Sequence, residues 1–295
     1  MDFDLVKAAW KGMRPIHWIK SGFCLAPLFF SGLFVSWQAW MNLVPLLIAI
    51  SLLSSAGYLW NDIRNVEEDR CHPRKRHRPV ASGNLPVKWA HCVAITCVVI
   101  GLSILVLNYS SGLVTWLGLT YLLVTVIYTL SLRELPLLDV LVLSFGFVVR
   151  VAAGSFALKL IPSIWLLATT YSFALMLAFG KRRGEVFFIN SRQGEIGQTR
   201  GALRGYTVPL LDVLIAVSAL LTIGSYFGLV VPTGSWWMLL SAAPVMMGAS
   251  DYLRWAWRSD KIEMPEKLVA RSQVLRLSLL VWGGCLVLAQ VLPWG

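Results

Sequence analysis

The chain has 295 residues, of which 57% are hydrophobic and 14% charged, and its mean hydropathy is +0.68. A water-soluble domain carries about 25% charged residues, so this composition excludes an ordinary soluble globular protein and predicts a membrane protein. The formal net charge of +11 raises the question of a nucleic-acid partner, which the placement of the charges along the chain decides.

Apolar runs long enough to cross a bilayer occur nine times along the chain. A spanning helix needs about 20 predominantly apolar residues. We therefore expect an all-α integral membrane protein with nine transmembrane helices in one membrane-embedded domain, residues 1–295. The expected helices lie at residues 17–36, 41–60, 89–108, 112–131, 137–158, 162–180, 207–231, 234–252 and 272–293.

The positive charges fall in alternate connections between these helices. Every Lys and Arg except Arg150 and Lys159 lies at the entrance of the first helix or in and beside four connections, at residues 61–88, 132–136, 181–206 and 253–271. By the positive-inside rule, the N-terminus and these connections are cytoplasmic and the C-terminus is outside. The charge therefore predicts a topology rather than a nucleic-acid partner, and we expect the site for a polar substrate to open to the cytoplasm.

The stretch WNDIRNVEEDRCHPRKRHRPVASG, residues 60–83, begins where the second helix reaches the cytoplasm. If the helical phase continues, Asp62, Asn65 and Asp69 share one face, with Asn61 four residues before Asn65. Such oxygens suit Mg²⁺, which takes one or two protein carboxylates and completes its shell with water and substrate phosphate. A simple charged loop explains the same residues through the positive-inside rule. The cations that follow, which can hold phosphate, are Arg74, Lys75, Arg76 and Arg78.

The fifth expected helix carries a smaller constellation. Asp139 and Arg150 lie eleven residues apart, close to three helical turns, so they share a face. An arginine at that depth in a membrane is a functional candidate. The alternative is an arginine that serves helix packing, with Gly146 and Gly154 one turn away on either side.

The string N-D-x-x-N-x-x-x-D followed by H-P-x-K-x-x-R-P-x-A-S-G closely resembles the first aspartate-rich motif of the UbiA superfamily of intramembrane prenyltransferases. Nine helices with cytoplasmic motif loops fit that superfamily as well. Further matches are RPIHWIKSGFCLAPLF, YTLSLRELPLLDVLVLSFGFVVRVAAG and FGKRRGE, so the resemblance extends over residues 14–185.

The resemblance is nearest to one branch of the superfamily. Its aromatic prenyltransferases have a second aspartate-rich motif between the sixth and seventh helices, where this chain reads AFGKRRGEVF. Lys181, Arg182 and Arg183 cannot ligate a cation, although Glu185 can assist. One acidic cluster and one basic cluster suit a single Mg²⁺ with additional phosphate, as in the decaprenyl-phosphate phosphoribosyltransferase branch. Asn65 stands where the family usually has aspartate, which removes one negative charge from the metal face.

The resemblance implies a mechanism and a setting. Mg²⁺ on Asp62 and Asp69, with help from Asn61 and Asn65, holds the pyrophosphate of phosphoribosyl pyrophosphate, and a polyprenyl phosphate attacks the anomeric carbon. The enzyme lies in a bacterial cytoplasmic membrane and makes a cell-envelope glycan precursor. The implied substrate-binding residues are Lys20, Lys75, Arg78, Tyr128, Arg133, Asp139, Arg150, Lys181, Arg182 and Glu185.

Two other functions compete with this interpretation. An aromatic prenyltransferase, which moves a prenyl group from a prenyl diphosphate to an acceptor such as 4-hydroxybenzoate, would use the same fold and first motif. The absence of a second acidic motif at residues 181–185 counts against it. A transporter usually places polar residues and broken helices near the midplane of the membrane. Here the polar residues gather at one membrane face, and only Arg150 lies at depth.

Overall fold

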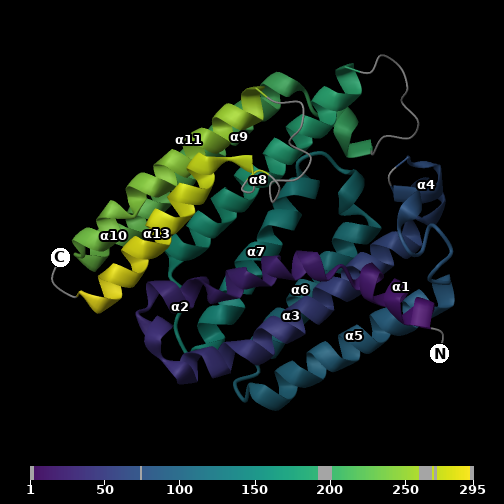
Figure 1. The fold of residues 1–295 in the computed structure, drawn as a ribbon, viewed down its shortest axis with the longest axis horizontal. Helices are drawn as coiled ribbons and strands as arrows, with labels where there is room; N and C mark the ends of the chain where they lie inside the picture. The colour runs from purple at the N-terminus through teal and green to yellow at the C-terminus, as the bar shows by residue number, and fades with distance from the viewer. Residues whose placement is uncertain (1–2, 74, 192–200, 259–267, 269–270, 293–295) are drawn as a thin grey trace. The chain divides into compact units, whose positions relative to one another are not determined.

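The computed structural model describes residues 3–73, 75–191, 201–258, 268 and 271–292, and all the regular structure in these residues is helical (Figure 1). Seven described helices are long and apolar enough to cross a membrane. They are α3 (Trp37–Arg64), α5 (Val87–Asn108), α6 (Leu113–Leu130), α7 (Leu138–Ala157), α8 (Ile164–Ser191), α9 (Val208–Val230) and α13 (Gln273–Val291).

Two of the nine expected helices are broken into shorter pieces. The first run consists of η1 (Pro15–Leu25), α2 (Ala26–Phe30) and η2 (Leu33–Val35), and Gly32 has a left-handed φ of 75° between the last two. The eighth consists of α10 (Trp236–Leu240) and α11 (Ala242–Arg258). Pro244 lacks the N–H that would continue α10 into α11. The all-helical membrane fold therefore holds, while nine spans remain a prediction.

The remaining described elements are short and lie outside the seven long helices. They are α1 (Phe3–Met13), α4 (Val66–Cys71), η3 (Lys75–His77), η4 (Leu132–Glu134), η5 (Gly201–Gly205) and η6 (Val231–Thr233). The chain forms two compact units. Unit 1 comprises residues 1–28, 33–132 and 149–161, and unit 2 comprises residues 29–32, 133–148 and 162–295.

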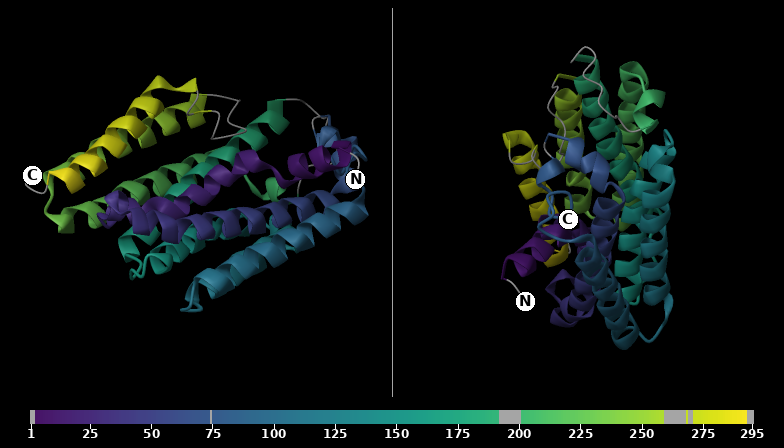
Figure 2. Two further views of the ribbon diagram at one scale, coloured as in Figure 1. Left: turned by 60° about the horizontal axis from the view of Figure 1, so that its bottom comes forward. Right: turned by 90° about the vertical axis from the view of Figure 1, so that its right-hand side faces the viewer.

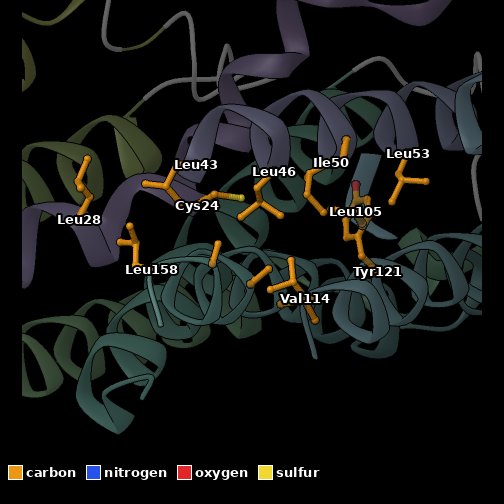
Figure 3. Close-up of a cluster of buried hydrophobic side chains, with 14 of the residues drawn as sticks. Cys24, Leu28, Leu43, Leu46, Ile50, Leu53, Leu105, Val114, Tyr121 and Leu158 are labelled. Carbon is orange, nitrogen blue, oxygen red and sulfur yellow. The ribbon is translucent and has the colours of Figure 1, made fainter. Parts of the chain in front are cut away.

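Unit 1 is built around α3. This helix packs on η1, α5 and α6, and it runs beside α5 in both sets of views (Figures 1 and 2). Leu43, Leu46, Ile50 and Leu53 of α3 are fully buried and form one side of the apolar cluster in Figure 3. Membrane helices associate through close packing and small residues. Gly57 is such a residue, because a Cβ at this position would collide with the side chain of Thr125 on α6.

Unit 2 contains α8 and α9, which pack against each other, and α13, which lies along α11 (Figure 2). Its core includes the buried side chains of Met176, Leu211 and Ile215. Helix α9 begins at an N-cap, Thr207, whose hydroxyl accepts a hydrogen bond from the backbone N–H of Leu210. Such a cap satisfies one of the free donors of the first turn.

Candidate functional site

The acidic motif lies at the joint between α3 and α4. Asn65 separates the two helices with φ −102° and ψ 21°. Its N–H still donates to the carbonyl of Asn61 at 3.2 Å, and its own carbonyl accepts from the N–H of Asp69 at 2.8 Å. Because these bonds continue across the joint, the helical phase expected from the sequence is largely preserved.

Asp62 and Asp69 meet at one guanidinium group. Nη1 of Arg78 donates to Oδ1 of Asp62 at 3.0 Å and to Oδ2 of Asp69 at 2.6 Å. Both aspartates are only 1% exposed, and the Arg78 side chain is about one-quarter exposed. The structure thus brings together two carboxylates seven residues apart, and it places the predicted phosphate-binding Arg78 directly on them.

Arg14 is a third member of this cluster, although its position before the first helix predicts only a topological charge. It has a left-handed φ of 55°, and its Nη2 donates to Oδ1 of Asp62 at 2.5 Å. Its guanidinium lies over the ring of Tyr58, 5.2 Å from the centroid. The sequence signal that includes Arg14 is the matching stretch RPIHWIKSGFCLAPLF, which begins at this residue.

The donor atoms of this cluster fit a hard divalent cation. Oδ2 of Asp62 is buried and has no hydrogen-bond partner in the part of the chain that the structure describes. Nδ2 of Asn65 donates to the carbonyl oxygen of Asn61 at 2.5 Å, so its Oδ1 is presented as an acceptor. No group of three or more His, Cys, Asp or Glu side chains suits a metal among the described residues. The set is therefore two carboxylates and two amides, and Mg²⁺ needs only one or two carboxylates.

Arg150 forms a second polar cluster within unit 1. It is buried, and its Nη2 donates to the hydroxyl of Tyr121 at 2.7 Å and to that of Ser54 at 3.3 Å. Its guanidinium lies 4.4 Å from the centroid of the Tyr121 ring. Near it, Gly154 packs against the carbonyl of Cys24 so closely that a Cβ would overlap that oxygen. Arg150 thus has the contacts expected of a packing arginine, alongside its candidacy as a binding residue.

The other sequence candidates in unit 1 are partly buried. Lys20 lies on η1, Lys75 begins η3, and Tyr128 lies in the last turn of α6. Arg76 is exposed, and Arg74 lies outside the described residues.

Unit 2 holds the remaining candidates, and its centre is Asp139. This carboxylate is fully buried, accepts from Nε of Arg182 at 2.7 Å and accepts from the hydroxyl of Tyr206 at 2.6 Å. Nη1 of Arg182 also donates to Glu185 at 2.5 Å. The Tyr206 hydroxyl accepts from the N–H of Leu137 at 2.7 Å. Burial raises the pKa of Tyr206 above its ordinary value, and the bond to Asp139 adds to the shift.

These ion pairs change the interpretation of the basic residues Lys181, Arg182 and Arg183. Arg182 was expected to hold substrate phosphate, but its charge is engaged by Asp139 and Glu185. Arg183 is paired with Asp212 at 2.5 Å. Lys181 is partly buried on the same helix.

Arg133 is buried, and its Nε lies 3.5 Å from a carboxylate oxygen of Glu134. Glu134 also accepts a hydrogen bond from the N–H of Gly201 at 2.7 Å.

Asp139 and Arg150 both lie on α7, as predicted. Their hydrogen-bond partners differ, since Asp139 contacts Arg182 and Tyr206 whereas Arg150 contacts Tyr121 and Ser54.

A family model and similar sequences relate this chain to the same protein family. The family model described as the UbiA prenyltransferase family matches residues 24–280. A decaprenyl-phosphate phosphoribosyltransferase from Corynebacterium glutamicum is 30% identical over 291 residues, covering 95% of this chain and 85% of the relative. A protein of the same name from Mycobacterium tuberculosis is 31% identical over 298 residues, covering 95% and 93%.

Solved structures share the fold at low sequence identity. A UbiA homolog from Archaeoglobus fulgidus, bound to GPP and Mg²⁺, matches with a TM-score of 0.73 at 13% identity and covers 96% of this chain and 99% of that chain. A digeranylgeranylglyceryl phosphate synthase matches with a TM-score of 0.68 at 11% identity, covering 98% and 99%. Since the family match covers most of the chain and the fold agrees with it, this chain belongs to the UbiA prenyltransferase family and is a multi-pass membrane transferase.

Proposed function

We propose that the protein transfers the 5-phosphoribosyl group of phosphoribosyl pyrophosphate to a polyprenyl phosphate, such as decaprenyl phosphate, and releases pyrophosphate. The observation that carries the proposal is the contrast between the acidic cluster on α3 and α4 and the basic residues on α8. Asp62 and Asp69 form a carboxylate pair in unit 1, whereas the corresponding motif position on α8 presents Lys181, Arg182 and Arg183. The curated relatives that align with almost the whole chain bear the name of this activity.

The acidic cluster is proposed to bind the donor's pyrophosphate through Mg²⁺. Asp62 and Asp69 supply carboxylate oxygens, and Asn61 and Asn65 supply amide oxygens. A bound Mg²⁺ would neutralise part of the charge on the leaving pyrophosphate. The unpartnered Oδ2 of Asp62 supports this role, because a buried carboxylate oxygen without a hydrogen bond is costly unless a ligand occupies it.

The arginines of the same cluster are proposed to bind the donor phosphates directly. Arg78 and Arg14 are paired with Asp62 and Asp69 in the structure. Once Mg²⁺ binds these carboxylates, the two guanidinium groups can instead form paired hydrogen bonds to the phosphate oxygens of the donor. Lys75, Lys181, Tyr128 and Arg133 remain candidates for further contacts with phosphate or ribose.

The chemistry requires one bond to form and one to break at the anomeric carbon. An oxygen of the lipid phosphate attacks this carbon as the bond to pyrophosphate breaks, through a transition state with oxocarbenium character and with inversion. The attacking phosphate is already ionised at neutral pH, so no general base is needed. What the protein supplies is orientation and fixed positive charge around the phosphates.

The setting is part of the proposal. The concentration of Lys and Arg in alternate connections supports a bacterial cytoplasmic membrane location with the acidic cluster facing the cytoplasm. There the water-soluble donor is available, and the product would serve as a precursor of cell-envelope glycan.

A paired assay tests the reaction. Purified protein with Mg²⁺ would receive labelled phosphoribosyl pyrophosphate and polyprenyl phosphate in one reaction, and labelled prenyl diphosphate and 4-hydroxybenzoate in the other. We expect a labelled phospholipid only in the first. Product only in the second would establish the aromatic prenyltransferase alternative, and no product in either, with substrate uptake into proteoliposomes, would favour a transporter.

Asp62→Asn keeps the shape of the side chain and removes its charge, and it should lower the transfer rate by at least about a hundredfold. Glu67→Gln is the matched control, because Glu67 is 79% exposed and pairs only with Arg70 in the described ion pairs. Full activity of the Asp62 variant would remove the metal assignment.

A further inference from the structure

The segment η1 is an eleven-residue 3₁₀ helix. This is unusual, because 3₁₀ runs longer than three or four residues are uncommon. With 3.0 residues per turn, every third side chain of such a helix points in the same direction. The side chains of η1 therefore form three straight rows.

One row is exposed and apolar. Ile16 is 79% exposed and Ile19 is 74% exposed. A Cβ at Gly22 would meet nothing within 4 Å. In a chain that spans a membrane, exposed apolar side chains of this size are most stable in contact with hydrocarbon. This row is therefore the lipid-facing side of η1.

A second row attaches η1 to α3. Nε1 of Trp18 donates to the hydroxyl of Ser55 at 2.9 Å, and the hydroxyl of Ser51 donates to that of Ser21 at 2.9 Å. Three residues of 3₁₀ helix rise about 6 Å, and so do four residues of α-helix. The spacing of Trp18 and Ser21 thus matches that of Ser51 and Ser55, and this match favours the 3₁₀ form of η1.

The third row starts at the N-cap residue Arg14 and continues with His17 and Lys20; we call it the cationic row. Arg14 and the ring of His17 lie 5.2 and 5.3 Å from the centroid of the Tyr58 ring. Lys20 follows His17 by three residues, one turn of the 3₁₀ helix, and so continues the same row. Arg14 and His17 thus face Tyr58 of α3, a single turn before Asp62.

The two ends of the cationic row have different surroundings. Arg14 is ion-paired with Asp62 in the acidic cluster. Lys20 lies six residues further along η1, a rise of about 12 Å, and it directly follows the lipid-facing Ile19. A ligand with an anionic head and a hydrocarbon tail matches this order, because its head can bind the row while its tail follows the exposed apolar row.

We propose that Lys20, His17 and Tyr58 bind the phosphate of a lipid phosphate monoester, the acceptor of the reaction proposed above, on which this inference rests. Lys20 supplies a charge-assisted hydrogen bond, and the His17 ring and the Tyr58 hydroxyl supply further donors.

Binding in nanodiscs tests this subsite without the chemical step. Binding of a labelled polyprenyl phosphate would be measured against the corresponding uncharged polyprenol, with no donor and no metal. We expect wild type to favour the phosphate, and Lys20→Gln to weaken phosphate binding about tenfold or more while polyprenol binding is unchanged. His17→Gln should have a smaller effect, and Lys20→Arg should restore most of the affinity.

Two matched variants sharpen the test. Lys7→Gln removes an exposed charge from α1 and should change nothing. Exchanging residues 19 and 20, by Ile19→Lys with Lys20→Ile, keeps the composition but moves the charge to the lipid-facing row, so it should bind the phosphate no better than Lys20→Gln. Thermal unfolding and size-exclusion chromatography confirm that each variant is folded.

Other outcomes would overturn the subsite. These are unchanged phosphate binding in Lys20→Gln, recovery of binding in the exchanged variant, or inorganic phosphate competing as well as the lipid. Failure of the proposed function is separable from these outcomes. If polyprenyl phosphate binds as expected but no phosphoribosyl product forms, the subsite stands and the reaction does not.

Discussion

Asn65 shows how one residue sets both the shape and the charge of the acidic cluster. It forms the joint between α3 and α4, and its amide donates to the carbonyl oxygen of Asn61 at 2.5 Å. An aspartate at this position would add a third carboxylate beside Asp62 and Asp69, but it would lose that donor. The chain therefore has a less negative cluster, with a hydrogen bond that holds the joint.

The Asn65→Asp variant should bind divalent cations more tightly. A unit charge a few ångströms away lowers the free energy of a bound cation by at least about 1 kcal/mol, even when it is well solvated, which corresponds to about fivefold or more in affinity. Mn²⁺ binding measured by electron paramagnetic resonance without substrate, together with a Mg²⁺ titration of activity, would show this shift. Glu67→Gln should leave both curves in place, and weaker Mn²⁺ binding in Asn65→Asp would contradict the assignment.

Local spacing was sufficient to predict that Asp62 and Asp69 lie together, because both belong to nearly continuous helix. Local spacing could not predict that Arg14 and Tyr58 lie beside this acidic cluster. Arg14 reaches Asp62 from 48 positions away in sequence, through a left-handed backbone conformation that no periodicity reveals. Contacts of this kind depend on tertiary packing.

At the scale of elements, the buried Asp139 joins three segments of unit 2. It lies on α7, Arg182 lies on α8, and Tyr206 precedes α9. The sequence identified Asp139 and Arg182 as candidates for substrate binding, but it contained no signal that they bind each other. Pairing between residues 43 positions apart depends on how the two helices pack.

Arg182→Gln should destabilise the protein strongly, because it leaves the buried charge of Asp139 uncompensated. The loss expected for one partner of a buried ion pair is about 3–5 kcal/mol, seen as a lower thermal midpoint in detergent. Adding Asp139→Asn to Arg182→Gln should recover part of that loss. The exposed Arg258→Gln is the control. A stable but inactive Arg182→Gln would instead show that Arg182 contacts substrate.

Gly154 tests the close approach of α7 to η1. A Cβ at this position would overlap the carbonyl oxygen of Cys24, which is backbone and cannot rotate away. Gly154→Ala should therefore cost about 1–3 kcal/mol through overpacking, again measured as a thermal midpoint. Gly283→Ala on α13 meets nothing within 4 Å and should be neutral or slightly stabilising, since alanine favours helix. Equal effects of the two substitutions would contradict the packing argument.

At the scale of the whole molecule, the charge distribution predicts which connections share a side of the membrane. Cys71, at the exposed end of α4, should be cytoplasmic, and Ser111, between α5 and α6, should be outside. In variants with one cysteine each, an impermeant maleimide should label Ser111→Cys in intact cells of a bacterial host. It should label Cys71 only after the membrane is permeabilised, and the reverse pattern would invert the topology.

Composition and hydropathy predicted the helical membrane fold, because the bilayer demands long apolar helices. They could not reveal that the first run is largely 3₁₀ helix or that α10 and α11 are separate. The first feature depends on the contacts of η1 with α3, Trp18 to Ser55 and Ser51 to Ser21, and the second on Pro244.

The 3₁₀ form of η1 also has a consequence for length. As a plain α-helix, the sixteen residues of Pro15–Phe30 would extend about 24 Å, short of the hydrocarbon thickness of about 30 Å. Eleven residues of 3₁₀ helix followed by the five of α2 extend about 30 Å. The 3₁₀ form thus gives these sixteen residues the length that an α-helix reaches with about twenty, and a change of η1 to an α-helix would shorten the segment.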